Sequence, residues 1–148
     1  MGGFWHRKES MERGEYQHPR RGKQPILFSG FTDGTITPTD LDALWDYNGK
    51  GWIIAEAKYN GKEVDTGQRI AFENWVKTCR AAGVRCLVII VDHYVSNPDE
   101  GVILRDGWVR KMYSTETMDW TYPQQPITAK EVVDRYKKKF KLRGKYEA

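Results

Sequence analysis

Two acidic residues and a lysine flank a short turn sequence in the middle of the chain. Asp42 precedes the turn, and Glu56 and Lys58 follow it. Two carboxylates that lie close together repel each other, and a hard cation such as Mg²⁺ relieves the repulsion because it prefers oxygen ligands. Such a cation acidifies a water and polarises a phosphoryl oxygen, while a lysine stabilises the developing charge. These residue types therefore suit the hydrolysis of a phosphodiester.

A β-hairpin is predicted around this turn. Apolar-rich runs at residues 41–45 and 52–55 flank the sequence NGKG at residues 48–51, which is typical of a hairpin turn. The turn sequence permits a loop of either two or three residues. The two forms differ in register by one residue, and this shift moves side chains to the opposite face of a strand.

The loop length determines whether the charged side chains meet. With a three-residue loop, Asp42 lies directly opposite Glu56, and Asp40 lies opposite Lys58. With a two-residue loop the acids point apart. Asp40 and Asp42 are alternatives for the first metal ligand, and we favour Asp42 because its run continues into the apolar strand.

A helix and a buried strand are predicted after the hairpin. Apolar residues recur at helical spacing over residues 66–82, and Asp65 with Gln68 resembles a capping box. The continuous apolar run within residues 84–95 indicates a strand that is covered on both faces. Further predictions are a first strand at 24–31, a second hairpin at 102–113 that turns at 105–107, and a last helix from Thr128 to about Leu142. Thr128 with Glu131 again resembles a capping box.

This order of elements predicts an α/β fold with a central mixed β-sheet flanked by helices. The 148 residues fit one domain, spanning 1–148. We expect residues 1–24 to form an arm or loop, with a short helical turn near 10–16, and residues 141–148 to form a basic tail. No apolar run is long enough to cross a bilayer, and the polar N-terminus lacks a secretory signal, so we expect no membrane association and a cytoplasmic location. Two cysteines outside any CxxC pair cannot supply a structural zinc site.

The charge distribution suits an enzyme that acts on a polyanion. Residues 32–60 contain two lysines and five acids, whereas residues 130–148 contain eight Lys and Arg against three acids. Basic ends around an acidic centre could grip phosphates, although a solvated surface is the more ordinary interpretation. The candidates for phosphate contact are Arg20, Arg21, Lys137, Lys138, Lys139, Lys141 and Arg143.

Residues 36–95 resemble the PD-(D/E)xK nuclease superfamily. The resemblance rests on PTDLD at 38–42, EAK at 56–58 and the helix start TGQR at 66–69, with a buried strand following in the family's order. It is closest to small phage-type endonucleases and archaeal-type Holliday-junction resolvases. The sequence departs from the pattern because the Pro-Asp pair is not contiguous.

The resemblance implies a restriction-endonuclease-like core and a role for each site residue. Asp42 and Glu56 would bind Mg²⁺, for which Mn²⁺ would substitute, with assistance from the carbonyl of Ala57. Lys58 would be the catalytic lysine, and Gln68 an accessory active-site residue. Many members also carry an N-terminal glutamate, for which Glu12 and Glu15 are both candidates.

The expected function is that of a metal-dependent DNA endonuclease. A Mg²⁺-activated water would attack phosphorus, and the resemblance implies 5′-phosphate and 3′-hydroxyl products. A homodimer is plausible, because cutting two strands requires two sites, and a phage-encoded enzyme would act in the cytoplasm of its bacterial host. The alternatives are a non-catalytic nucleic-acid-binding module on the same fold and an RNA-directed nuclease.

Overall fold

The structure, a computed structural model, describes residues 24–144, and the chain divides into two compact units, Met1–Pro38 and Thr39–Ala148. The described part of the first unit contains one isolated bridge, between Asp33 and Ile36, and neither a helix nor a strand. The strand expected at 24–31 is therefore wrong: this short apolar stretch is exposed and pairs with no other strand of the described chain. The helical turn expected at 10–16, and all but the last residue of the predicted arm, lie outside the described residues.

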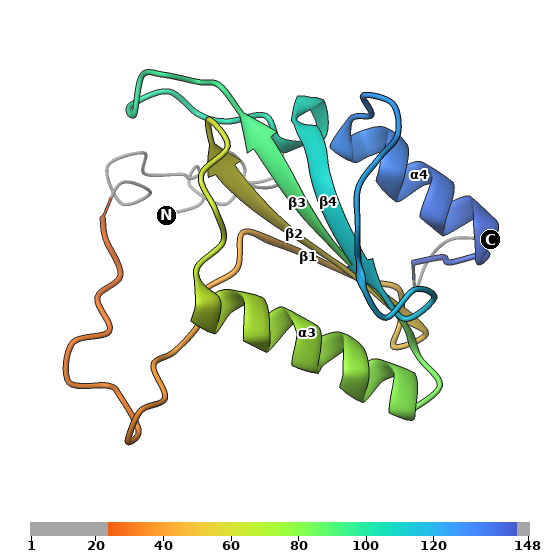
Figure 1. Cartoon of the computed structure of the whole chain (residues 1–148), viewed down its shortest axis with the longest axis horizontal. Coiled ribbons are helices and arrows are strands. Elements are labelled where there is room, and N and C mark those ends of the chain that lie inside the picture. Colours follow the sequence, from red (N-terminus) through yellow and green to blue (C-terminus); the bar gives the residue numbers. More distant parts are fainter. Residues whose placement is uncertain (1–23, 145–148) are drawn as a thin grey trace, which may run out of the picture. The chain divides into compact units, whose positions relative to one another are not determined.

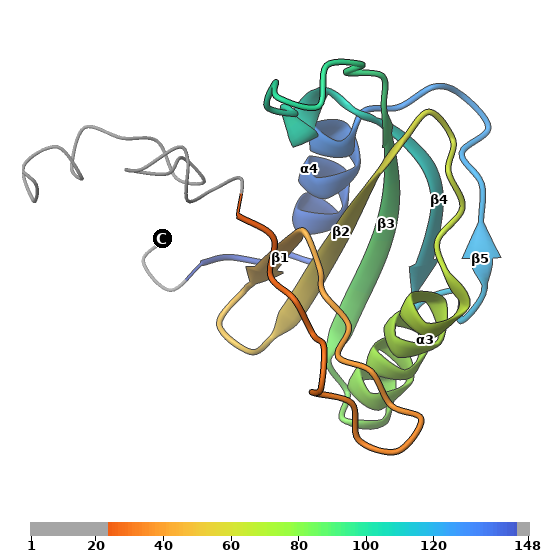
Figure 2. The same ribbon diagram turned by 90° about the vertical axis from the view of Figure 1, so that its left-hand side faces the viewer.

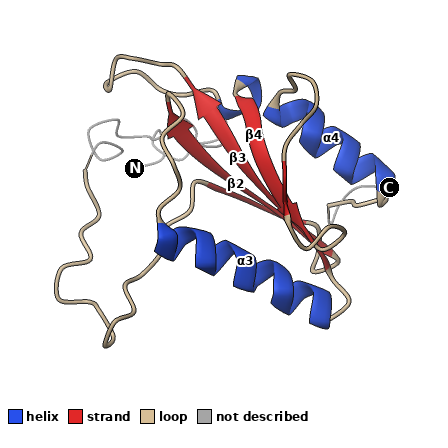
Figure 3. Cartoon of the chain, in the orientation of Figure 1, coloured by secondary structure: helices blue, strands red, loops and turns tan. Residues whose placement is uncertain are grey.

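A five-stranded mixed sheet forms the centre of the second unit (Figures 1 and 3). Its strands lie in chain order, with β2 parallel to β3 and the other neighbours antiparallel. The strands are β1 (Ala43–Asp46), β2 (Gly51–Tyr59), β3 (Arg85–His93), β4 (Trp108–Ser114) and β5 (Trp120–Thr121).

The two helices cover opposite faces of this sheet (Figure 2). Helix α3 (Thr66–Ala81) buries Phe72 against the side chains that point to one face of the sheet, among them Ile54. Helix α4 (Ala129–Lys139) buries Val132 in a second cluster on the other face. The prediction of an α/β fold with a mixed sheet between helices is thus confirmed. Within residues 24–144, no helix has the length and apolar character needed to cross a bilayer.

The central strand is β3, as its continuous apolar run predicts. Every residue from Cys86 to Asp92 is buried, because the side chains point alternately to the two faces of the sheet, and α3 covers one face and α4 the other. The parallel β2–β3 pair requires a crossover, and α3 supplies it.

Both helices begin where their capping residues predict. The Asp65 carboxylate accepts the N–H of Gln68 at 2.8 Å, and the Thr128 hydroxyl accepts the N–H of Glu131 at 3.3 Å. Helix α4 ends at Lys139, before the predicted Leu142, because Lys141 takes a left-handed conformation with φ of 53°.

The second hairpin, expected at 102–113, does not form. Residues Leu104–Asp106 make a single 3₁₀ turn, η1, and the preceding apolar residues are exposed. After the turn the chain passes very close to β3: a Cβ on Gly107 would lie 2.3 Å from Cγ1 of Val91. Strand β4 therefore pairs with β3 and β5, because residues 102–104 form no strand with which it could make the expected hairpin.

Candidate active site

The turn between β1 and β2 takes the three-residue form. The N–H of Tyr47 donates to the carbonyl of Gly51 at 2.9 Å and closes a loop at residues 48–50. Asn48 and Gly49 both have positive φ, 57° and 73°, a region that glycine and asparagine tolerate best. The turn chemistry thus determines the register of the whole hairpin.

This register brings Asp42 beside Glu56. Ala43 pairs with Ala55, so the next residue on each side places Asp42 opposite Glu56. Strand pairing ends at Ala43. Beyond it, the N–H of Ala57 donates to the Asp42 carboxylate at 2.8 Å instead of to a main-chain carbonyl of β1. Because the N–H and C=O of one strand residue point the same way, the Ala57 carbonyl also faces this side.

Glu56 is an acid buried inside the α3 layer. Its residue is 5% exposed, and its Oε2 atom has no hydrogen-bond partner among residues 24–144. Burial and the neighbouring Asp42 charge raise the pKa of Glu56 above 4.5, against the opposing effects of Gln68 and Lys58. The Lys58 ammonium lies 3.6 Å from Glu56 Oε1, which is an ion pair but longer than a hydrogen bond.

Gln68 reaches this acid from the first turn of α3. Its backbone N–H makes the capping bond, whereas its side chain, in a residue only 4% exposed, turns towards the sheet. The amide Nε2 lies 3.4 Å from the carbonyl of Asp40, and Oε1 has no partner in the described chain. From the sequence alone, the Gln68 side chain could equally fold back and cap the start of the helix.

Asp40 and Asp42 have different positions. The main-chain oxygen of Asp40 contacts the Gln68 amide, and its exposed carboxylate contributes least to the raised pKa of Glu56. Asp42 is the acid directly across the hairpin from Glu56. The geometry therefore favours Asp42 over Asp40 as the partner of Glu56.

The residues at this point suit a hard cation. Glu56 Oε2 and Gln68 Oε1 are buried oxygen atoms that have no hydrogen-bond partner within residues 24–144. The Asp42 carboxylate, which accepts the Ala57 N–H, lies close enough to raise the pKa of Glu56. The described residues hold no cluster of three His, Cys, Asp or Glu that could bind a metal. An all-oxygen set with few charged ligands fits Mg²⁺, which retains several waters, and does not fit a structural zinc ion.

The basic residues at the chain's C-terminal end lie away from these oxygens. Helix α4 covers the opposite face of the sheet, and Leu142 packs against Gly51 at the start of β2. Glu56 is five residues further along the strand, or about 17 Å at the usual rise per residue. The residues of this region that the sequence suggested for phosphate contact are Lys137, Lys138, Lys139, Lys141 and Arg143. Arg20, Arg21, Glu12 and Glu15 lie outside the described residues.

Three charged residues of β3 and β4, which the sequence alone did not indicate as site residues, lie on the side of β2 away from β1. Asp92 is the neighbour of Lys58 in the β2–β3 register, and Arg110 holds Asp92 through its Nε and Nη2 groups. Lys111 follows Arg110 on β4. The sequence signal that could have indicated Arg110 and Lys111 is a pair of charged residues within an otherwise apolar strand, WVRKMY. Only the structure shows that these two side chains are largely covered.

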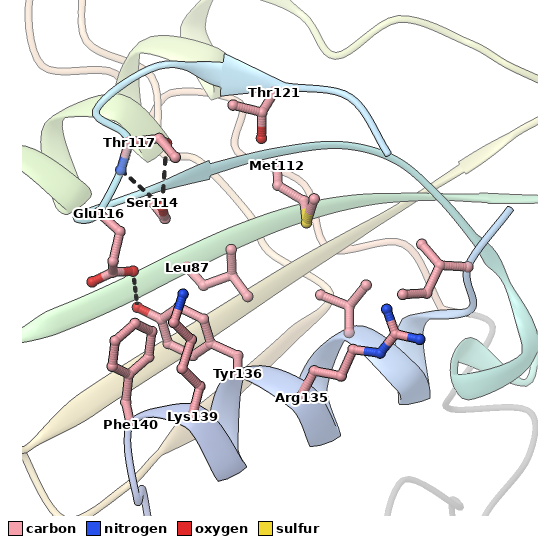
Figure 4. A pocket seen from close by; sticks show the side chains of 12 residues that line it. Leu87, Met112, Ser114, Glu116, Thr117, Thr121, Arg135, Tyr136, Lys139 and Phe140 are labelled. Atoms are coloured by element: carbon pink, nitrogen blue, oxygen red, sulfur yellow. Dashed lines mark hydrogen bonds between the residues drawn. The ribbon is translucent and has the colours of Figure 1, made fainter. Parts of the chain in front are cut away.

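A separate pocket of about 310 Å³ lies between β4 and α4 (Figure 4). Its polar groups are largely paired with each other: the Tyr136 hydroxyl donates to Glu116 at 2.6 Å, and Ser114 bonds Thr117 at 3.2 Å. Burial raises the pKa of Tyr136 well above its ordinary value, so the phenol stays protonated. The pocket is on the α4 face and has no part in the arrangement around Glu56.

The raised pKa of Glu56 predicts how stability depends on pH. Its contribution to the free energy of unfolding is fully present below about pH 4.5 and is lost as the pH rises through the higher pKa of the folded state. In EDTA, Glu56→Gln should therefore gain stability relative to wild type as the pH rises from 4.5 to 8, measured by urea unfolding. The exposed Glu100→Gln should show no such trend. If the difference in unfolding free energy between wild type and Glu56→Gln does not change with pH, the burial argument is contradicted.

Comparison with protein-family models, with curated proteins and with solved structures finds no match. The assignment of a function therefore depends on the residues of this chain and their geometry. The fold and the site define a class: an α/β protein with two carboxylates, an amide and an ammonium near one end of strand β2.

Proposed function

We propose that this chain is a metal-dependent endodeoxyribonuclease. The observation that carries the proposal is the meeting of Asp42, Glu56, Lys58 and Gln68 at the end of β2, where a buried glutamate oxygen has no partner among the residues that the structure describes. Burying an acid in this way is unfavourable, and it persists where a bound cation offsets the cost.

Each residue has a distinct role in the proposed reaction. Asp42 and Glu56 would hold Mg²⁺, or Mn²⁺ in its place, with the Gln68 amide oxygen and the Ala57 carbonyl as further ligands. Bound there, the ion supplies acidity to a water and positive charge to a phosphoryl oxygen. Lys58, whose ammonium is not committed to a short bond, orients the water and donates to the oxygens that gain charge at phosphorus.

The proposed step is a hydrolysis in which one bond forms and one breaks. The water oxygen bonds to phosphorus, the bond from phosphorus to the 3′ oxygen breaks, and the water's proton passes to that leaving oxygen. The products are a 5′-phosphate and a 3′-hydroxyl, as the resemblance to the PD-(D/E)xK nucleases implies.

The order of elements also supports this family and its restriction-endonuclease-like core. The hairpin, the helix α3 and the buried strand β3 follow one another as the resemblance requires. The proposed substrate suggests action in the cytoplasm, that of a bacterial host if the chain is phage-encoded. A homodimer would supply the second site needed for a double-strand cut.

The test is incubation of wild-type protein with plasmid, linear duplex, branched DNA and matched RNA, with Mg²⁺ or with EDTA. We expect cleavage of DNA that requires the ion. Cleavage of RNA alone would assign the site to an RNA-directed nuclease. Gel shifts of intact DNA without cleavage, in any divalent ion, would identify a non-catalytic binding module and contradict the proposal.

A further inference from the structure

Two cations of β4 lie side by side on the face of the sheet that carries Glu56. Lys111 is in register with Ile90, which is itself in register with Glu56, so Lys111 lies two strands away from that acid. Two interstrand spacings amount to about 10 Å. Arg110 precedes Lys111 at an irregularity in the β3–β4 pairing and bonds Asp92, the neighbour of Lys58.

The Arg110 guanidinium is only partly used by the protein. Its Nε donates to both Asp92 oxygens at 3.1 and 3.0 Å, and its Nη2 donates to Asp92 and to the carbonyl of Lys62, the latter at 2.8 Å. Its Nη1 is buried and has no hydrogen-bond partner in the described chain. A buried N–H group without a partner is unfavourable unless something else binds there.

The Lys111 ammonium is held in place by an aromatic ring. It lies 4.6 Å from the centre of the Trp120 ring, and its side chain is 11% exposed. The Trp120 ring is fixed in turn, because its Nε1 donates to Glu73 at 2.8 Å. The aromatic contact orients the ammonium but neutralises none of its charge.

One exposed acid, Glu63, lies close to both cations. The Glu63 carboxylate lies 3.6 Å from Arg110 Nη1 and 3.8 Å from Lys111 Nζ, and both distances exceed a hydrogen bond. Glu63 belongs to the loop between β2 and α3, and its side chain is 75% exposed. Such exposed, loose ion pairs contribute little, so another anion can replace the carboxylate readily.

We propose that Arg110 Nη1 and Lys111 Nζ form a subsite for a backbone phosphate of a nucleic-acid strand, and that Glu63 occupies it until the strand displaces it. The distance of about 10 Å from Glu56 is within a few nucleotides of the same strand, at a rise of about 3.4 Å each. This inference rests on the proposed function, to which it adds the place where the substrate is gripped. A planar guanidinium with a free N–H and an adjacent ammonium provide the donors that a phosphate accepts.

The test measures the affinity of a short DNA duplex in EDTA, so that nothing is cut, for four variants of the full chain. Lys111→Gln should weaken binding about tenfold at low salt and lower the salt slope by about one unit, the value for one lost phosphate contact. Glu63→Gln should tighten binding about two- to fivefold, because it releases two cations. The matched controls are Lys130→Gln on the opposite face and Glu100→Gln in another loop, and each should change affinity less than about twofold.

A double variant separates displacement from general charge. If Glu63 competes for the subsite, its replacement should tighten binding less in the Lys111→Gln protein than in wild type. Equal tightening in both backgrounds, equal effects of the paired controls, or unchanged affinity in both test variants would overturn the subsite.

The outcome is independent of catalysis. Protein that binds as expected but cuts nothing would contradict the proposed nuclease activity and leave the phosphate subsite intact. Metal-dependent cutting by protein whose DNA affinity does not change with Lys111→Gln or Glu63→Gln would contradict the phosphate subsite and leave the nuclease activity intact. Thermal unfolding of each variant checks that the exchanged side chains have not disturbed the fold.

Discussion

Replacing Glu56 with glutamine is expected to lower metal-dependent DNA cleavage about a thousandfold or more. The amide keeps the size of the side chain but removes the buried charge that would hold the ion. A metal contributes several kcal/mol to phosphoryl transfer, and each 1.36 kcal/mol is a factor of ten in rate. Single-turnover cleavage of a labelled duplex at saturating protein measures the effect.

The same variant should remain folded and should still bind DNA. Glu56 is buried with a raised pKa, so a neutral side chain there removes an unfavourable charge rather than a stabilising one. Glu100→Gln, an exposed change of equal charge, is the control and should cut at the wild-type rate. Wild-type cleavage by Glu56→Gln would remove this glutamate from the reaction.

Replacing Lys58 with alanine is expected to lower the cleavage rate about 100- to 1,000-fold with little change in DNA affinity. In the proposed reaction the ammonium stabilises charge that appears only in the transition state, and the loss of one such donor typically has this effect. It lies 3.6 Å from Glu56 and is mostly covered, so few surface contacts disappear with it. Rates under single turnover and duplex affinity in EDTA are measured separately.

Lys62→Ala is the matched control, since Lys62 is an exposed residue of the loop after β2. It should retain most of the wild-type rate. An equal loss in the two variants would indicate a general effect of positive charge. A rise in the dissociation constant of Lys58→Ala with an unchanged rate at saturation would reassign Lys58 to substrate binding.

The parts of the fold that could be predicted are those with strong local signals. The turn at Asn48 and Gly49 and the caps at Asp65 and Thr128 act within a few residues, and the structure confirms each. The turn sequence permits two registers, and the structure shows the three-residue form, which places Asp42 opposite Glu56. The hairpin was therefore accessible from the sequence, but the choice between the two registers was not.

The errors arose where a local signal has two structural outcomes. The sequence at 105–107 is a turn signal, and the chain does turn there, but it turns onto β3 instead of forming a hairpin. Which strand accepts β4 depends on the close approach of Gly107 to Val91, a contact between distant segments. Helical periodicity likewise indicates that α4 has a buried side, without indicating which face of the sheet it covers.

Arg110 and Lys111 illustrate the remaining gap. Consecutive cations in a strand are usually solvated, and their burial depends on Trp120, Glu63 and Asp92, which come from three other parts of the chain. Conversely, the clustered lysines of α4 form a prominent pattern in the sequence but lie on the face away from Glu56.

The most direct test of the account is the position of a divalent ion in the folded protein. Crystals grown with Mn²⁺ should show an anomalous peak about 2 Å from Glu56 Oε2 and from a carboxylate oxygen of Asp42, with Gln68 Oε1 turned towards it. The same crystals of Glu56→Gln should lack the peak. Fully ordered Asp42 and Glu56 side chains with no peak between them at millimolar Mn²⁺, or a peak bound only elsewhere, would contradict the central claim.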